Sequence, residues 1–221
     1  MILRRDIAAK FLSTFSSTLS AENVQKGLSL FKDKIGKKVA ASDFNLIDDP
    51  FLKGGFNSTP FDGEGVATRK KEVIKDGKLT TYLHNLKTAK RAGVESTGNA
   101  YRSSHKSSVG IAPTNMYIEE GDYSYEDIIK ATDKGIIITE VQGLHSGANT
   151  ISGDFSLGAL GFLVENGEIT RAVEQITISG NFIDMIKDID MIGNDFEMGL
   201  PGKGHFGSPS LRIESLDIAG E

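Results

Sequence analysis

The four histidines, His84, His105, His145 and His205, are the first residues to consider for metal chemistry, because the chain has no cysteine. A zinc peptidase usually carries two histidines one helical turn apart, with a carboxylate that deprotonates the metal-bound water. The histidines here are isolated along the sequence, so only tertiary folding could bring two of them together. We therefore expect no metal site in this chain.

Two short motifs match functional patterns by their letters alone. Residues 202–207 have the Gly-x-Gly-x-x-Gly spacing of a dinucleotide fingerprint, but Ser-Pro at 208–209 leads into an apparent strand where that motif needs a helix. In segment 143–147, His145 directly precedes Ser146, and neighbouring residues of an extended segment point to opposite faces. That order is a poor arrangement for a histidine-activated serine. We predict a turn at the first motif and no catalytic residue at either.

A polar, glycine-rich segment, residues 143–156, has the groups to contact a ligand. Its glycines allow the backbone to approach a ligand closely, and His145, Asn149, Ser152 and Asp154 offer hydrogen-bond donors and acceptors. Two interpretations are open. The segment is either a peptide-contacting loop, or a loop whose Asn, Ser and Asp side chains serve only its own turns.

Two N-terminal helices are expected among the elements that position this loop. Apolar residues recur at four-residue spacing from Ile7 to Leu19 and predict a helix over residues 4–19. Ser20 can cap a second helix, whose apolar stripe extends to Ile35 and which Gly36 would end. We predict that the two helices form a hairpin that covers a sheet.

Two β-hairpins are predicted, each by a dipeptide that suits the positive φ angles of a type I′ turn. The turns are Asp76-Gly77, between strands 72–75 and 78–84, and Asn166-Gly167, between strands 160–165 and 168–173. Residues 44–50 predict a short strand that Pro50 stops. The β-branched run 136–141 predicts a central strand buried on both faces.

The remaining elements complete an α+β fold. Ser124, with Asp127 three residues later, is typical of a capping box and predicts a helix that ends at Gly135. Residues 181–192 predict another helix, and residues 211–218 a closing strand. The predicted class is α+β, with a β-rich core of mixed or antiparallel sheet, an N-terminal helical hairpin and two further helices. We interpret residues 1–221 as a single domain.

Composition argues against several classes of function. The formal net charge is -5 and basic residues are scattered among acidic ones, so we expect no nucleic-acid partner. No apolar run reaches the roughly 18 residues of a membrane helix, and the first residues lack a signal peptide. The absence of cysteine fits a reducing compartment. We expect a cytoplasmic protein without a membrane partner.

Several separated blocks of the sequence resemble the PmbA/TldD family. Segment 143–169 is similar to the family's C-terminal signature, and the other matching blocks lie on both sides of it. They are residues 19–22, 47–50, 60–65, 96–100, 177–181 and 192–195. The resemblance therefore covers essentially the whole chain.

The resemblance implies the C-terminal domain of a PmbA/TldE-type subunit, with the N-terminal half of that subunit absent. In this family, a TldD-type subunit carries a His-Glu-x-x-x-His motif and cleaves unfolded peptides with a bound zinc. TldD-type C-terminal halves also supply a cysteine ligand, and this chain has none. Zinc is therefore expected only in a TldD-type partner. An older family label is modulator of DNA gyrase.

From this resemblance we expect the domain to form part of a peptide cleft and of a subunit interface in a metallopeptidase complex that matures or degrades peptides. Its partner would be a TldD-type subunit or a second copy in a dimer, and the chain alone would be inactive in proteolysis. The candidate peptide-binding residues are His145, Asn149, Ser152 and Asp154, followed by Thr97 and Asn99. The alternative is a non-enzymatic interaction or regulatory domain, for example a DNA gyrase modulator. A hydrolase that uses His145 or Ser146 is a third possibility.

Overall fold

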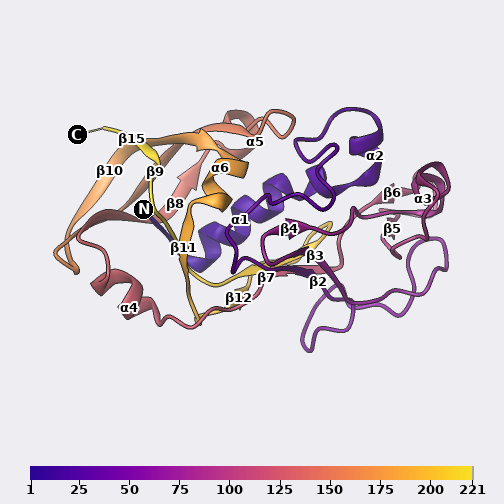
Figure 1. The fold of residues 1–221 in the computed structure, drawn as a ribbon, viewed down its shortest axis with the longest axis horizontal. Helices are drawn as coiled ribbons and strands as arrows, with labels where there is room; N and C mark the ends of the chain where they lie inside the picture. Colours follow the sequence, from indigo (N-terminus) through magenta and orange to yellow (C-terminus); the bar gives the residue numbers. More distant parts are fainter. Residues whose placement is uncertain (221) are drawn as a thin grey trace.

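The first helix lies between two large β-sheets in the computed structural model, which describes residues 1–220 (Figure 1). This helix, α1 (Arg5–Phe15), continues as the 3-10 turn η1 (Ser16–Leu19), so the helix predicted over residues 4–19 is confirmed. It contacts strand β8 of one sheet and strands β12 and β13 of the other. Its buried side chains are Ile7, Ala8, Ala9, Phe11, Leu12 and Phe15. Helix α1 is therefore a core element instead of a surface cover.

The larger sheet has seven strands, with the predicted central strand in the middle. Its order is β11 (Ile189–Ile192), β14 (Leu211–Ile213), β1 (Ile2–Leu3), β8 (Lys134–Gln142), β9 (Asp154–Glu165), β10 (Glu168–Asn181) and β15 (Asp217–Ala219). Strand β8 is parallel to β1 and antiparallel to β9. Its neighbouring residues Ile137 and Ile138 belong to separate hydrophobic clusters. Because neighbouring strand residues face opposite ways, both faces of β8 are covered, as predicted.

The second sheet has six strands and supports most of the loops described below. Its order is β12 (Glu197–Met198), β13 (His205–Ser208), β7 (Asn115–Ile118), β2 (Leu46–Asp48), β3 (Lys71–Lys75) and β4 (Lys78–Leu79). Strand β2 is the strand predicted over residues 44–50. A separate pair consists of β5 (Ala100–Tyr101) and β6 (Gly110–Ile111). The two glycines at 202 and 204 precede β13 and no helix follows, so the turn predicted there is confirmed.

Both predicted hairpins are present. Asp76 and Gly77 have φ angles of 48° and 71°, and Asn166 and Gly167 have φ angles of 52° and 78°. Positive φ at both central residues is the requirement of a type I′ turn. The β9–β10 hairpin is longer than predicted, whereas β4 stops at Leu79.

The predicted second helix is wrong in its extent. Helix α2 covers only Ala21–Gln25, and the side chain of Ser20 makes no capping hydrogen bond. Gly27 adopts a φ of 72°, a left-handed conformation that ends the helix well before Gly36. Leu28 and Ile35 are 44% and 47% exposed, so they do not continue a buried stripe.

The helix predicted over residues 124–135 is shorter than expected. Helix α4 (Tyr125–Lys130) begins with the predicted capping box between Ser124 and Asp127, with both reciprocal hydrogen bonds formed. The helix ends before Gly135, which belongs to β8. The capping box is therefore confirmed, and the predicted helix end is wrong.

The helix predicted over residues 181–192 and the closing strand each divide in two. Helix α6 (Phe182–Lys187) gives way to β11, because Ile189, Met191 and Ile192 pair with β14. The closing strand predicted over residues 211–218 is split into β14 and β15, which lie in different parts of the sheet. Sheet pairing, a tertiary effect, outweighs the local helical pattern here.

Two helices were not predicted: α3 (Leu86–Ala92) and α5 (Leu144–Gly147). The α+β class with mixed and antiparallel sheet is confirmed. The number of further helices is wrong, because four helices follow α2 in residues 1–220. None of the helices in this part of the chain combines the length and the apolar character of a membrane crossing.

Candidate functional site

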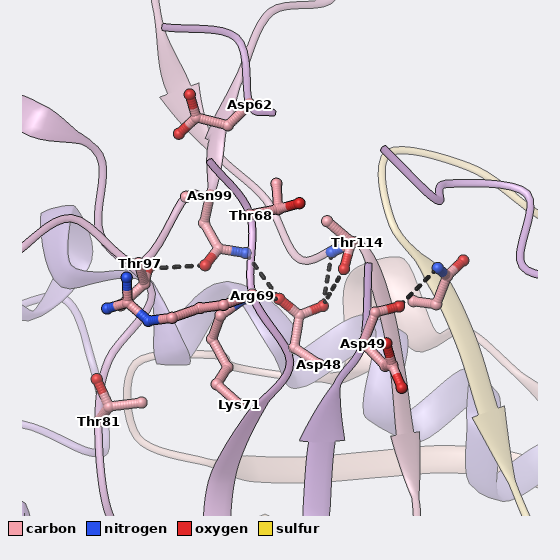
Figure 2. Close-up of polar contacts among 12 residues, drawn as sticks. Asp48, Asp49, Asp62, Thr68, Arg69, Lys71, Thr81, Thr97, Asn99 and Thr114 are labelled. Atoms are coloured by element: carbon pink, nitrogen blue, oxygen red, sulfur yellow. Dashed lines mark hydrogen bonds and ion pairs between the residues drawn. The ribbon is translucent and has the colours of Figure 1, made fainter. Parts of the chain in front are cut away.

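The end of strand β2 carries a buried carboxylate, Asp48, which organises the surrounding loops (Figure 2). One carboxylate oxygen accepts hydrogen bonds from Lys71 Nζ and Asn99 Nδ2, both at 2.8 Å. The other oxygen accepts from the backbone N of Thr114 at 2.7 Å and from its hydroxyl at 2.8 Å. Thr97 Oγ1 donates to Asn99 Oδ1 at 2.7 Å. We call these five residues the Asp48 network.

The network balances the cost of burying a charge. Asp48 is 0% exposed and the Lys71 side chain only 7% exposed, so water screens this ion pair poorly. Four donors around one carboxylate satisfy its lone pairs. The network therefore fixes three segments relative to one another. They are the loop that contains Thr97 and Asn99, the loop before β7, and the first residue of β3.

A second carboxylate, Asp62, anchors the neighbouring loop. Its Oδ1 accepts from the backbone N of Glu64 at 2.9 Å and of Val66 at 3.0 Å, and its Oδ2 accepts from the backbone N of Ala100 at 2.9 Å. Residues 62–66 are thereby turned back on themselves and held against β5. No catalytic role is needed to explain this carboxylate.

A groove runs along the loops that these networks hold. It consists of three adjoining depressions of about 410, 360 and 440 Å³. Asn99 and Thr114 line the first depression, Ser16 of η1 lines the second, and strand β12 lines the third. The first two share Ala112, Pro113, Gly202 and Lys203, and the last two share Ser13, Leu200 and Phe206. The three depressions therefore adjoin one another, and together we call them the groove.

Segment 199–204 forms one wall of this groove and depends on a glycine. A Cβ atom at Gly204 would lie 2.7 Å from the Phe206 ring and 2.8 Å from Pro113, which is too close. Lys203 Nζ lies 5.8 Å from the ring centre of Tyr101 on β5, a favourable cation–π distance. Leu200 is 94% exposed at the groove. The wall is thus held close to its neighbours at residues 203–204, and it presents an apolar side chain to the groove.

The histidines are not grouped for metal binding. His84 and His205 are buried, whereas His105 and His145 are exposed. His205 accepts from the backbone N of Phe56 at 3.2 Å through Nδ1, which assigns the proton to Nε2, 2.9 Å from the Gly199 carbonyl oxygen. Within residues 1–220, no three His, Asp or Glu side chains come together as a metal-binding group.

The candidates Thr97 and Asn99 belong to the Asp48 network, and both are buried. Besides contacting Asn99, Thr97 Oγ1 accepts from the backbone N of His84 at 2.6 Å. Asn99 Nδ2 also donates to the Ala112 carbonyl at 3.1 Å. The polar atoms of both side chains hold the loops that form the groove wall. Direct contact of either residue with a peptide stays a prediction.

The other four candidates lie on the α5–β9 connection. His145 is exposed on α5. Asn149 Oδ1 accepts from the backbone N of Ile151 at 2.9 Å and of Ser152 at 3.2 Å, so this side chain serves its own turn. Asp154 Oδ1 accepts from Asn181 Nδ2 at 2.9 Å, and this hydrogen bond lowers the pKa of Asp154.

These contacts are those of the second interpretation, a loop that satisfies its own turns. Of the four candidate side chains on this segment, the exposed imidazole of His145 makes the fewest hydrogen bonds within residues 1–220. The structure brings Thr97 and Asn99 together, and it brings Asn149, Ser152 and Asp154 together in a separate loop. Peptide binding by any of them stays a prediction.

Sequence reasoning missed the residue at the centre of the site. Asp48 was read only as part of a strand end and a family block, and Lys71 and Thr114 were not considered. One signal was available: two consecutive carboxylates, Asp48 and Asp49, directly follow an apolar strand and precede a proline. A carboxylate at that point is either exposed or held by several donors, and only the tertiary fold supplies the donors.

Comparison with known proteins identifies the family. Residues 1–220 match the model of the PmbA/TldA metallopeptidase C-terminal domain. The metalloprotease PmbA of Escherichia coli O157:H7 is 34% identical over 221 residues, covering 100% of this chain and 46% of that protein.

Two solved structures share the fold. A Thermotoga maritima protein proposed to be a modulator of a DNA gyrase has a TM-score of 0.92 and 45% identity, covering 99% of this chain and 49% of that one. TldE from Thermococcus kodakarensis has a TM-score of 0.90 and 30% identity, again covering 99% of this chain and 49% of its own. The chain spans about half the length of these relatives. It belongs to the PmbA/TldD family and corresponds to the family's metallopeptidase C-terminal domain.

Proposed function

We propose that this chain acts as the C-terminal domain of a PmbA/TldE-type subunit in a TldD-like metalloprotease complex. Its groove receives an unfolded peptide. A surface next to the groove forms the interface with a TldD-type subunit or with a second copy of this chain. The zinc and the catalytic groups belong to the TldD-type subunit, and this chain contributes no metal ligand. Its role is to hold and orient the peptide.

The groove is the observation that carries this proposal. It passes hydroxyl groups of α1 and η1, the exposed side chain of Leu200 and the glycines of segment 202–204. The lining also includes charged side chains of both signs, such as Lys203 and Glu197. A lining that mixes apolar, hydroxyl and oppositely charged groups suits peptides of many sequences, because it does not demand one particular side chain. The Asp48 network and Asp62 keep the groove walls in place before a peptide arrives, which reduces the entropic cost of binding.

Strand β12 supplies a second supporting feature. It is an edge strand of the six-stranded sheet, and it lines the third depression of the groove. An unpaired strand edge binds extended peptides through main-chain hydrogen bonds, a mode that tolerates varied side chains. A peptide in the groove would therefore be held in an extended conformation, the form that a peptidase cleaves.

Mixing the chain with a TldD-type subunit tests the proposal. We expect the two to co-elute in size-exclusion chromatography, and cleavage of an unstructured peptide to rise when this chain is added. Removing zinc with a chelator should abolish cleavage without dissociating the complex, since the metal would reside in the partner. If the chain neither co-elutes nor changes the cleavage rate, the proposal is wrong.

A non-enzymatic regulatory role is the second candidate. The observation in its favour is the similarity to the Thermotoga maritima protein proposed to be a modulator of a DNA gyrase. Binding of the purified chain to gyrase, with a change in supercoiling rate and no effect on peptide cleavage, would place this role ahead of the peptidase role.

A further inference from the structure

A cavity of about 540 Å³ opens between α2, the chain that follows α3 and the chain that follows β4. None of its lining residues lines the groove described above. Thr97 lines this cavity and Asn99 lines the groove, so the Asp48 network lies between the two. Its volume falls within the range of about 300–1,000 Å³ that is common for small-molecule sites.

The cavity lining contains one cationic side chain, Arg69, and one anionic side chain, Glu95, which do not form an ion pair with each other. Arg69 Nη1 donates to the Ser96 carbonyl at 3.0 Å, and Figure 2 shows its guanidinium beside Thr97. Across residues 1–220, neither Arg69 nor Glu95 takes part in an ion pair within 4 Å. The remaining guanidinium donors of Arg69 are suited to a planar carboxylate, which they can bind in a bidentate manner.

A buried polar atom in the lining also lacks a partner. His84 is 5% exposed, and its Nδ1 makes no hydrogen bond within the part of the chain that the structure describes. Burial lowers the pKa of His84, and the backbone of Thr88 opposes this only in part, so the neutral imidazole is favoured. A buried nitrogen without a partner is costly. Because this atom is closed to solvent, His84 shapes the cavity wall and its Nδ1 is not a contact for a ligand in the cavity.

The rest of the lining includes an apolar surface. Val24, Ile35, Tyr82 and Val94 contribute to it. Ile35 and Val94 are 47% and 52% exposed, so much of their apolar surface is open to solvent. A ligand with a small aliphatic group would bury these side chains, and the hydrophobic effect would favour its binding.

We propose that this cavity binds a small zwitterion, either a free amino acid or a dipeptide with an aliphatic side chain. The ligand's carboxylate pairs with Arg69, its ammonium group faces Glu95, and its aliphatic side chain covers Val94 and Ile35. Glu95 disfavours multiply charged anions, which distinguishes this site from a general phosphate site. The proposal does not depend on the peptidase role.

Isothermal titration calorimetry with the dipeptide alanyl-valine tests the site. We expect saturable binding with one site per chain, and at least a tenfold weaker affinity for the C-terminal amide of the same dipeptide, since the neutral amide lacks the charge and the second acceptor oxygen of a bidentate carboxylate. Arg69→Gln should weaken binding at least tenfold. Arg91→Gln removes the same charge from an exposed position on α3 outside the cavity and should leave the affinity unchanged.

Glu95→Gln provides a second variant at an exposed position, in case Arg69→Gln disturbs the chain around Ser96. It should weaken the dipeptide and strengthen inorganic phosphate. Three results would overturn the proposal: no saturable dipeptide binding, equal affinity for the amide, or phosphate binding at least as tight as that of the dipeptide in the unmodified protein.

Discussion

The ammonium of Lys71 lies 2.8 Å from a carboxylate oxygen of Asp48, and both side chains are almost completely removed from solvent. A buried pair of this kind is expensive to break, because the remaining charge has neither water nor a counter-charge. Asp48 also accepts three further hydrogen bonds, from Asn99 and twice from Thr114. Removing the Asp48 carboxylate should therefore destabilise the fold more than removing the Lys71 ammonium.

Asp48→Asn should lower the free energy of unfolding by about 3–5 kcal/mol. An asparagine amide nitrogen would face donors whichever way it is oriented, and Lys71 would lose its counter-charge. Lys71→Met should cost less, about 1–3 kcal/mol, because the carboxylate keeps three hydrogen bonds. Urea unfolding monitored by circular dichroism measures both values.

The double variant and an exposed pair supply the controls for this prediction. Combining Asp48→Asn with Lys71→Met should cost less than the sum of the single changes, because the two side chains share one interaction. Lys75→Met removes an ammonium 2.9 Å from Glu72, where both side chains are about half exposed, and should cost clearly less than Lys71→Met, because water screens this pair. Equal costs for Lys71→Met and Lys75→Met would contradict the importance of the buried pair.

The sequence predicted best those parts of the fold that local chemistry determines. The Asn166-Gly167 turn and the Ser124 capping box need only their own residues to be recognised. The predicted helix to Ile35 failed because Gly27 ends it, although the apolar spacing continued by coincidence. The predicted helix over residues 181–192 failed because β14 offers its second half a pairing partner far away in the sequence.

The candidate site was less accessible to sequence reasoning. The donors around Asp48 come from positions 71, 99 and 114, and nothing local connects them. Thr97 and Asn99 were identified by resemblance to a family block, but their role in a buried network was not expected. The glycine-rich segment 143–156 attracted attention because it is polar, yet polarity alone does not separate a binding loop from one that caps its own turns.

His84 should make stability depend on pH. Its pKa is lowered by burial in the folded state, so the unfolded chain takes up a proton first as pH falls below the ordinary histidine value of about 6.5. The contribution of His84 to stability is therefore constant above that value and declines as pH falls from it towards the lower folded-state pKa. Urea unfolding at intervals between about pH 7.5 and 5 follows this decline.

Replacing the imidazole separates His84 from the other titrating groups. His84→Gln should flatten the stability profile over this pH range relative to the unmodified protein, even if the variant is less stable throughout. His105→Gln removes an exposed imidazole and should keep the original slope. A His84→Gln profile parallel to that of the unmodified protein would rule out this origin of the pH dependence.

Two variants distinguish whether the loop after α5 contacts a peptide or only satisfies its own turns. Asn149→Ala removes the acceptor for two backbone N–H groups and should cost about 1 kcal/mol of stability. His145→Ala alters an exposed side chain and should leave stability within about 0.5 kcal/mol. If His145→Ala lowers peptide cleavage by the complex with a TldD-type subunit, the loop contacts the peptide. Unchanged cleavage by both variants would leave the loop with a purely structural role.

Leu200→Ser tests the groove itself. Because Leu200 is 94% exposed, its replacement should change the free energy of unfolding by less than about 0.5 kcal/mol. The same side chain lines two of the three depressions of the groove. A peptide in the groove would cover it, and burying a leucine contributes about 1.5–3 kcal/mol. We therefore expect roughly a tenfold or greater rise in the KM for peptide cleavage by the complex.

Ile169→Ser is the matched control for this change. Ile169 is 51% exposed at the start of β10 and lines none of the depressions. The control variant should keep both the stability and the KM of the unmodified protein, since an exposed aliphatic side chain away from the groove meets no peptide. A rise in KM for both variants would point to a general effect of surface hydrophobicity. A rise for Leu200→Ser alone, with kcat retained, would identify the groove as the place where the peptide binds, because a change confined to KM reports lost binding that is equal in the ground and transition states.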